Sequence, residues 1–423
     1  MTKIIILGGG FGGVRCVLDL NKKFKEQAQI TLIDKNSYHL FLPSLYEIAS
    51  AYGTNPPSAL IGGGGDPFAV KLRKTICIPY REIFEGKNIN FVQAEISAVD
   101  LKTKNIKTKG GEVLFYDCLV IALGSQTADF GIPGVREYAY QFKSIDDAVA
   151  VNVKIGRLVK KIASGEKMDS LKILVGGAGF SGIEFAAEIS TCVKKIYQAE
   201  NIKTKSATIT LIEAGPKILP MVSDKERKII SKRLTSLGVV LMENSSIEEV
   251  GDSFVKLKNG QILEGDMVVW TAGIKANEFL KSIPYLSTTD KGKIIVDENL
   301  LVQGWKNVFA VGDNQDFIDL KTQKSVPALA YTASDQGRVV AENIFRLTYN
   351  KSLKRYSPYY GVWIAPVGGK FALAHLWGGL MAKGFMGWVV RELVDLRYLV
   401  SILSFKKAVS LFWQEIIMFT KND

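Results

Sequence analysis

The same local pattern occurs twice in this chain, and the repeat constrains the fold more than any other feature. In "KIIILGGGFGGVRCVLDL" (3–20) and in "KILVGGAGFSGIEFAAEI" (172–189), an apolar run leads directly into glycines spaced G-x-G-x-x-G, and a helical pattern follows. A short β-branched run before such glycines predicts a buried parallel strand. One such turn is often an ordinary loop, but two units in the same order predict an α/β chain with two Rossmann-type domains.

The glycines of the first unit have separate predicted roles. One makes the tight turn, one lets a pyrophosphate approach the backbone, and one lets helix and strand pack closely. The phosphates then face the positive end of the helix. A second strand, 30–33, ends in an acid 21 residues after the last glycine, where a carboxylate accepts hydrogen bonds from ribose hydroxyls. The predicted site comprises Gly8, Gly10, Phe11, Gly12, Gly13, Asp34 and Lys35.

The second unit repeats this plan with a longer spacing. Its strand after the helix, in "TITLIEAG", ends in Glu213, which lies 31 residues after Gly182. A carboxylate at that position repels a 2′-phosphate, so it favours NADH over NADPH, although nearby Lys217 weakens the preference. Two dinucleotide sites suggest a tightly held flavin and an exchanging nicotinamide. The predicted second site comprises Gly177, Gly179, Phe180, Gly182 and Glu213.

Later segments also repeat and mark the domain boundaries. The strands in "CLVIALGS" (118–125) and "MVVWTAGIKAN" (267–277) each end in glycine downstream of their own glycine turn, and "NVFAVGDN" (307–314) adds another buried strand. The predicted order is a first domain over 1–125, a second domain over 126–290, a return to the first domain over 291–350 and a C-terminal segment over 351–423.

Charge and cysteine content narrow the partners. The net charge is +12, which favours an anionic partner such as nucleic acid, lipid or an acidic substrate. Four separated cysteines and two histidines offer no redox pair and no metal-ligand spacing, so no metal site is expected. Free cysteines without a secretory signal favour a cytoplasmic location, and no apolar run is long enough for a transmembrane helix.

These motifs together resemble the two-dinucleotide-binding-domain flavoproteins. The resemblance implies that the "ALG" and "TAG" stretches link the domains and that the acid of "VGD" contacts the ribityl and pyrophosphate part of FAD. "DKNSYHLFLPSLYEIASA" (34–51) and "GIPGVREYAYQFKSIDDA" (131–148) are more specific, and are similar to type II NADH dehydrogenases, the single-chain NADH:quinone oxidoreductases. Further cofactor-site residues implied by the resemblance are Pro43, Ala122, Gly124, Ala272, Gly273, Gly312, Asp313 and Ala330.

The resemblance also implies catalytic residues and one departure from the family. Glu184 matches a family glutamate near flavin and nicotinamide, although an acid in a first helical turn is also favoured by the helix dipole. The family motif A-Q-x-A-x-Q aligns with 330–335, where Tyr331 and Asp335 replace both glutamines. Tyr331 retains a hydrogen-bond donor, whereas an ionised Asp335 only accepts, which suits a quinone carbonyl poorly.

Three other polar residues have two open readings each. Glu188 is interpreted as structural or solvent-facing. His39 is either a satisfied buried histidine or part of the flavin pocket wall. Arg391 lies on a solvated helix face or, as in some family members, faces the active site; the first reading is favoured.

The C-terminal segment predicts an amphipathic helix over 396–419 that lies in a membrane surface, with Trp413 at the interface. Half of the excess positive charge lies in 351–423, so anionic lipid is the expected partner of residues 384–423. Docking on the body of the protein or on a second subunit, as in a homodimer, is the alternative.

The sequence therefore predicts an FAD enzyme that passes electrons from NADH to a membrane quinone, without ion pumping, at the cytoplasmic side of the membrane. An oxidase or diaphorase that uses oxygen or a soluble acceptor is the alternative. A nucleic-acid-binding flavoprotein of the apoptosis-inducing-factor type is disfavoured, because the basic residues are mixed with apolar ones and form no block.

Overall fold

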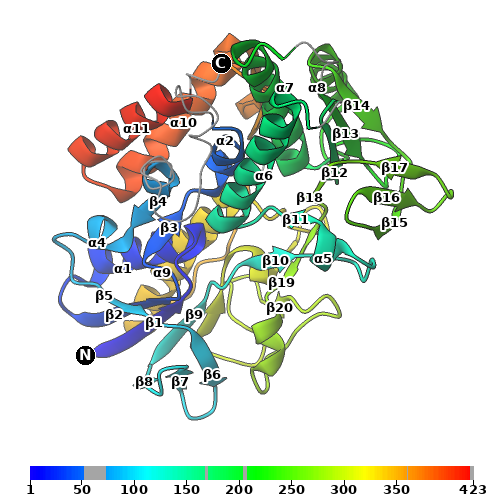
Figure 1. Cartoon of the computed structure of the whole chain (residues 1–423). Coiled ribbons are helices and arrows are strands. Elements are labelled where there is room, and N and C mark those ends of the chain that lie inside the picture. Colours follow the sequence, from blue (N-terminus) through cyan, green and yellow to red (C-terminus); the bar gives the residue numbers. More distant parts are fainter. Residues whose placement is uncertain (52–72, 167–169, 203–206, 360, 420–423) are drawn as a thin grey trace.

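A five-stranded parallel sheet in the order β21-β9-β1-β2-β5 forms the centre of the first domain (Figure 1). The structure is a computed structural model that describes residues 1–51, 73–166, 170–202, 207–359 and 361–419. Because the whole second domain separates β9 from β21, the first domain is discontinuous, as the sequence predicts. The strands are β1 (Thr2–Leu7), β2 (Ala28–Asp34), β5 (Asn90–Gln93), β9 (Cys118–Ile121) and β21 (Val308–Ala310).

The second domain repeats the arrangement with the order β11-β18-β12-β13-β14, again entirely parallel. Its helices are amphipathic, and α6 begins with a capping box made by Ser144 and Asp147. The elements are β11 (Tyr140–Gln141), α6 (Ile145–Ala163), β12 (Lys172–Gly176), α7 (Phe180–Ala199), β13 (Thr208–Ile212), α8 (Asp224–Ser236), β14 (Val239–Met242) and β18 (Met267–Trp270).

Both predicted linker segments meet each other between the domains. β10 (Ser125–Thr127) pairs antiparallel with β19 (Ile274–Ala276), directly after Gly124 and Gly273. The two chain crossings therefore run side by side, whereas the exact boundaries given above remain predictions.

Smaller elements complete the two domains. Helix α1 (Phe11–Phe24) packs against α9 (Ala330–Thr348), and α2 (Leu45–Ser50) packs against α6 and α7. The others are β3 (Tyr38–Leu40), η1 (Leu42–Ser44), β4 (Cys77–Pro79), α4 (Tyr80–Ile83), β6 (Ile96–Asp100), β7 (Asn105–Thr108), β8 (Val113–Phe115), α5 (Val135–Tyr138), β15 (Ile247–Val250), β16 (Phe254–Leu257), β17 (Ile262–Glu264), η3 (Glu278–Ser282), β20 (Ile294–Ile295), η4 (Gly312–Asn314), β22 (Gln315–Asp316), β23 (Ile318–Asp319) and β24 (Lys324–Ser325).

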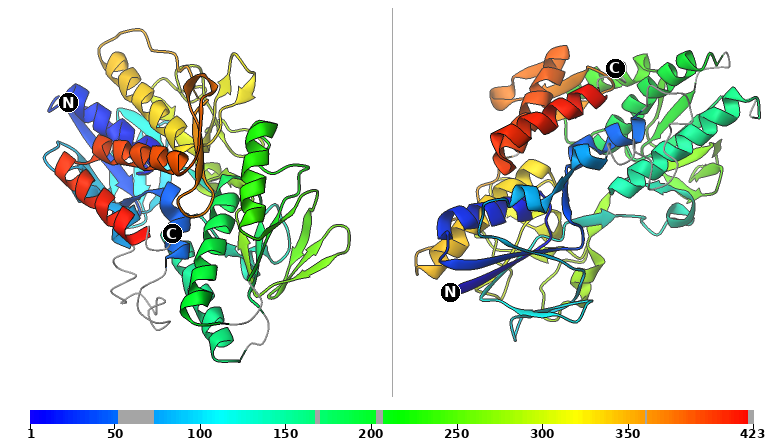
Figure 2. Two further views of the ribbon diagram at one scale, coloured as in Figure 1. Left: turned by 90° about the horizontal axis from the view of Figure 1, so that it is seen from above. Right: turned by 60° about the vertical axis from the view of Figure 1, so that its left-hand side comes forward.

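The C-terminal segment forms a small antiparallel sheet, which packs against α7 and α8 of the second domain, and two helices, which lie along the first domain (Figure 2). These are β25 (Trp363–Pro366), β26 (Ala372–His375), η5 (Trp377–Gly379), β27 (Met381–Gly384), α10 (Phe385–Ile402) and α11 (Phe405–Phe419). The single helix predicted over 396–419 is therefore wrong. The backbone is extended at Leu403, and a new helix starts where the Ser404 carbonyl accepts the Ala408 N–H.

The apolar residues of α10 and α11 divide into a buried set and an exposed set. Leu399, Ile402 and Phe412 are buried in the core of the first domain, which agrees with the docked alternative. Phe405 and Trp413 remain 71% and 56% exposed. In the described part of the chain, no helix is both long and apolar enough to cross a membrane.

The four cysteines are free. Cys16, Cys118 and Cys192 are buried, and Cys77 is half-buried. Burial raises the pKa of each of these thiols, so none is held as a thiolate nucleophile.

Candidate functional site

The first glycine turn joins β1 to α1 and leaves one stretch of backbone open. Gly8 has a φ of 99°, a conformation that favours glycine. A Cβ on Gly13 would lie 1.9 Å from the Gly8 carbonyl oxygen, whereas a Cβ on Gly10 would meet nothing within 4 Å. The outer glycines thus serve the packing of the protein, and the middle one leaves room for a pyrophosphate at the N-terminus of α1.

The second glycine turn has the same geometry between β12 and α7. Gly177 has a φ of 97°. A Cβ on Gly182 would lie 2.0 Å from the Gly177 carbonyl oxygen. A Cβ on Gly179 would again meet nothing within 4 Å. Ala272 lies against this turn: a Cβ on Gly177 would be 2.6 Å from the Cα atom of Ala272.

Both acids at the ends of the second strands bind their own turns. Asp34 Oδ2 accepts the Gly9 N–H at 2.6 Å, and Glu213 Oε2 accepts the Ala178 N–H at 2.8 Å. Each carboxylate is therefore fixed beside its glycine turn, and its contact with a ribose remains a prediction. Lys35, which follows Asp34, is exposed.

An open cavity of about 390 Å³ adjoins the second turn. Glu213 lines it together with Lys217 and Asp224, and the Lys217 ammonium lies 3.0 Å from an Asp224 carboxylate oxygen. The cavity is in the size range of small-ligand pockets, and Glu213, Lys217 and Asp224 supply charged groups.

The end of β21 meets the first linker beside the first turn. Asn314 Oδ1 accepts the Gly124 N–H at 2.9 Å, and Asp313 accepts the Ser125 hydroxyl at 2.7 Å. Lys143 from the second domain lies 3.7 Å from the same Asp313 carboxylate. The structure thus brings the predicted residues Ala122, Gly124, Gly312 and Asp313 to one edge of the sheet.

A narrow cavity beside Gly312 tests whether a flavin fits here. Gln336 Oε1 accepts the Gly312 N–H at 2.7 Å, and Thr332 Oγ1 is buried with no hydrogen-bond partner in the described part of the chain. Both residues line the cavity with Asp313 and Ala333. A flavin with its many acceptors and donors would satisfy the Thr332 hydroxyl, so the residues present fit this cofactor.

The two residues that replace the motif glutamines have different environments. Tyr331, which follows Ala330 at the start of α9, is 53% exposed. Asp335 is ion-paired with Arg338 at 3.1 Å, and burial raises its pKa while Arg338 opposes that shift. The described contacts of Asp335 do not include Glu184, so the structure does not join the three predicted catalytic residues in one group.

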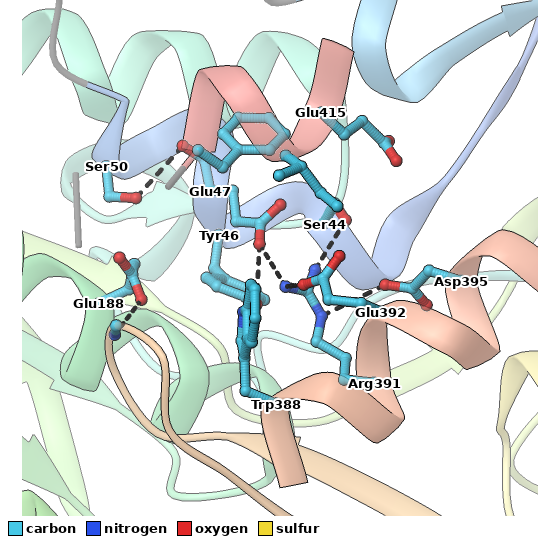
Figure 3. Close-up of a pocket in the computed structure, with 13 residues that line it drawn as sticks. Ser44, Tyr46, Glu47, Ser50, Glu188, Trp388, Arg391, Glu392, Asp395 and Glu415 are labelled. Carbon is cyan, nitrogen blue, oxygen red and sulfur yellow. Dashed lines mark hydrogen bonds and ion pairs between the residues drawn. The ribbon is translucent and has the colours of Figure 1, made fainter. Parts of the chain in front are cut away.

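Arg391 from α10 occupies the centre of a small acidic pocket (Figure 3). It is 8% exposed, and its guanidinium donates to Glu47 at 2.6 Å and to Ser44 at 3.1 Å. Asp395 lies 3.3 Å away and Glu392 3.1 Å away. The favoured prediction of a solvated Arg391 is therefore wrong, because buried carboxylates from α2 and α10 surround it.

Further carboxyl groups line the same pocket from other helices. Glu188 of α7 is buried and accepts the Gly369 N–H at 3.1 Å, so it is structural and not solvent-facing. Glu415 of α11 is 7% exposed, and its Oε1 has no partner in the described part of the chain. Burial holds the pKa of Glu415 well above its ordinary value.

The charged residues of the pocket also affect the pKa of Glu184, which lies on the first turn of α7. Burial raises the pKa of Glu184 to about 8; Arg391 opposes this, and Glu47 and Asp395 add to it. Burial likewise raises the pKa of Asp395 to about 7. Near neutral pH Glu184 therefore keeps its proton and Asp395 is partly protonated, whereas ordinary carboxyl groups are ionised.

Several functional candidates carried no signal that the sequence analysis used. Glu47 and Ser44 are separated from Arg391 by more than 340 residues, and only the fold joins them. Gln336 directly follows the altered motif, and its hydrogen bond with the Gly312 N–H places it at the site. Pro43 lies in η1 next to Ser44, and His39 is fully buried beside the first turn.

Comparisons with known proteins agree with this geometry. Residues 2–337 match the pyridine nucleotide-disulphide oxidoreductase family. The type II NADH:quinone oxidoreductase of Staphylococcus aureus (strain NCTC 8325 / PS 47) is 30% identical over 415 residues, which cover 96% of this chain and 98% of the relative. The structure of NDH2 from Plasmodium falciparum in complex with NADH has a TM-score of 0.79 at 22% identity, covering 98% of this chain and 97% of that one.

A third similarity shows how widely the fold is used. The sulfide:quinone oxidoreductase of Aquifex aeolicus has a TM-score of 0.76 at 17% identity, covering 97% of this chain and 94% of that one. Fold and glycine turns thus define a pyridine nucleotide flavoprotein oxidoreductase, with FAD and NADH as its cofactors. Within that class, the chain belongs to the type II NADH:quinone oxidoreductase family.

Proposed function

We propose that the chain transfers two electrons from NADH, through FAD held at the first glycine turn, to a membrane quinone, without moving ions across the membrane. One observation carries the proposal: the similarity to a type II NADH:quinone oxidoreductase spans 96% of the chain, and both glycine turns keep the geometry that the dinucleotides require. Under this proposal NADH, one proton and the quinone give NAD⁺ and the quinol.

The protein contributes position and electrostatics to this reaction. A bound flavin supplies the chemistry that accepts hydride from NADH and passes electrons to the quinone. The turn at Gly177–Gly182 holds the NADH phosphates at the N-terminus of α7, and Glu213 binds the adenosine ribose. Gly312 and Asp313 hold the flavin side, and Thr332 offers its hydroxyl there.

Glu184 is the proposed proton-holding residue. Reduction of a quinone consumes one proton beyond the hydride of NADH, and Glu184, with a pKa raised to about 8, carries a proton at neutral pH. The positive charge of Arg391 lowers the pKa of Glu184 and so opposes the effect of Glu47 and Asp395. Tyr331 is proposed as a donor to the quinone oxygen, and Asp335 as a less suitable neighbour in the same motif.

The membrane is proposed to contact the exposed side of α10 and α11, on the cytoplasmic face. Phe385, Met386, Leu393, Phe405 and Trp413 are each more than half exposed, and Arg397 and Lys406 lie exposed among them. Each basic residue near an anionic surface adds about 1 kcal/mol. Association as a homodimer through this segment is the alternative use of the same surface.

Vesicle sedimentation tests the membrane contact. A double substitution, Phe405→Ser with Trp413→Ser, is expected to release the protein from vesicles that contain an anionic lipid. Leu320→Ser, at a residue that is 65% exposed elsewhere, is the control and leaves binding unchanged. Unchanged binding by the double variant would contradict the membrane contact.

Stopped-flow absorbance of the flavin tests the reaction in two steps. Anaerobic NADH should bleach the flavin band quickly, and NADPH slowly. The bleached protein should then recover quickly with a quinone analogue and slowly with air. No bleaching by NADH would overturn the assignment of the second turn.

The second candidate function is an oxidase or diaphorase. The replacement of both motif glutamines by Tyr331 and Asp335, together with the Arg338 pair of Asp335, favours it. Recovery with air as fast as with quinone, in buffer without detergent, would decide for this candidate.

A further inference from the structure

One peptide group of the first glycine turn is held by side chains from outside the turn. The Gly9 carbonyl oxygen accepts the Tyr80 hydroxyl at 2.8 Å and lies 3.0 Å from His39 Nδ1. Both side chains are buried. In the second turn the corresponding carbonyl, that of Ala178, accepts only a backbone N–H, from Leu219 at 3.1 Å, among the contacts described.

The hydrogen-bond roles at His39 follow from its partners. A carbonyl oxygen only accepts, so Nδ1 carries the hydrogen that binds Gly9. Burial lowers the pKa of His39 to about 4, with the Gly9 bond opposing the shift, so the ring is neutral and Nε2 is an acceptor. The Tyr398 hydroxyl, 2.8 Å from Nε2, is therefore the donor.

Tyr398 belongs to α10, so the C-terminal segment reaches the first turn directly. Its ring packs 4.9 Å from the ring of Phe11, the residue that begins α1. Arg15 of α1 also donates to the Ser401 carbonyl of α10 at 3.4 Å. The helix that carries part of the exposed apolar surface is thus bonded to the first dinucleotide turn.

The orientation of the Gly9 carbonyl determines the direction of the next N–H. A trans peptide is planar, and its C=O and N–H point in opposite directions. Tyr80 and His39 hold the Gly9 carbonyl, so the Gly10 N–H points away from them. Hydrogen bonds to a carbonyl also polarise its peptide group, which strengthens the N–H as a donor to an anion.

We propose that Tyr398 and His39 are positioning residues for FAD: the chain of hydrogen bonds from Tyr398 through His39 to Gly9 orients the Gly10 N–H toward the FAD pyrophosphate. The proposal deepens the function above and rests on its assignment of FAD to the first turn. Under it, α10 helps to retain the flavin as well as facing the membrane.

The test is the rate at which the purified holoenzyme releases FAD after dilution, followed by the rise of flavin fluorescence. Tyr398→Phe removes only the hydroxyl and is expected to release FAD about three- to tenfold faster, the effect of one hydrogen bond. Tyr349→Phe is the matched control, because its hydroxyl binds Gln27 at 2.7 Å, away from the turn. It should release FAD at the wild-type rate.

A second variant separates positioning from packing. His39→Asn keeps an N–H near the Gly9 carbonyl, but its shorter side chain places no acceptor at the position of Nε2, which Tyr398 contacts in the wild type. Tyr398→Phe should then have no further effect on FAD release in the His39→Asn background, whereas a packing role predicts additive effects. Circular dichroism confirms that each variant is folded.

Two results would overturn the proposal: wild-type release rates in Tyr398→Phe, or an equal effect of Tyr398→Phe with and without His39. If Tyr398→Phe fails to fold, the release rate of His39→Asn alone decides, with a rate equal to the wild type counting against the proposal. A wild-type chain purified without any flavin would instead overturn the FAD assignment and this proposal with it.

Discussion

The two glycine turns have nearly identical backbones and very different surroundings. Gly8 and Gly177 have φ values of 99° and 97°, and an acid binds the N–H that follows each of them. The first turn is covered by Tyr80, His39 and the C-terminal helix α10, whereas the second borders an open cavity of about 390 Å³. This difference fits the proposal that the first turn retains a cofactor and the second exchanges one.

The largest predicted effect comes from filling the open position in each turn. Gly10 and Gly179 have φ values of −71° and −74°, which any residue adopts, so valine introduces no backbone strain. Gly10→Val should abolish FAD retention, because its side chain occupies the space of a pyrophosphate. Gly179→Val should keep FAD and raise the KM for NADH about a hundredfold, from the loss of two charge-assisted hydrogen bonds. Flavin content and NADH kinetics measure the two outcomes.

The pair contains its own control, because each variant should leave the other cofactor in place. Loss of flavin in Gly179→Val, with the chain still folded by circular dichroism, would remove the distinction between a retaining and an exchanging turn.

The second prediction sharpens the role of the acid at the exchanging turn. Glu213 accepts the Ala178 and Gly215 N–H groups at 2.8 Å with its two different oxygens. Glu213→Gln removes the negative charge and keeps one of these two acceptors, because the amide nitrogen only donates. The ratio of kcat/KM for NADPH to that for NADH should rise about tenfold, which is about 1.4 kcal/mol. Steady-state kinetics with both nucleotides measure it. Asp34→Asn at the retaining turn is the control and should leave this ratio unchanged.

The third prediction concerns the acidic pocket that α10 and α2 form on the retaining side. Burial raises the pKa of Asp395 from 3.8 to about 7 in the folded protein, with Arg391 opposing and Glu392 and Glu47 adding. The folded state therefore binds more protons than the unfolded state between these values, so the free energy of unfolding falls as pH rises through this window. Asp395→Asn should remove about 1–3 kcal/mol of that pH dependence.

Urea unfolding of the holoenzyme at pH 5 and pH 8 measures the effect. Asp224→Asn is a suitable control, since that carboxyl is exposed at the other turn and its neighbours Lys217 and Arg227 lower its pKa. An equal loss of stability between the two pH values in wild type and Asp395→Asn would show that another group of the pocket titrates.

Local features of the site were predictable and long-range ones were not. Gly8, Gly13 and Asp34 follow from spacing alone, because strand, turn and helix are neighbours in sequence. The burial of Arg391 was missed because its partner Glu47 lies on α2, and helical periodicity assigns a charged residue to solvent by default. The break at Leu403 was missed because the apolar pattern continues across it.

The smallest predicted effect tests whether the exchanging turn has a second specificity residue. Lys217 lines the same cavity as Glu213, but its ammonium is already paired with Asp224 at 3.0 Å and its side chain is 54% exposed. Exposed pairs contribute about 0–1 kcal/mol, so Lys217→Ala should change the NADPH to NADH ratio by about twofold or less. A larger change in the same kinetic assay would mean that Lys217 leaves Asp224 to bind the nucleotide. The exchanging turn would then gain its selectivity from a side chain that moves, in contrast to the fixed hydrogen bonds of the retaining turn.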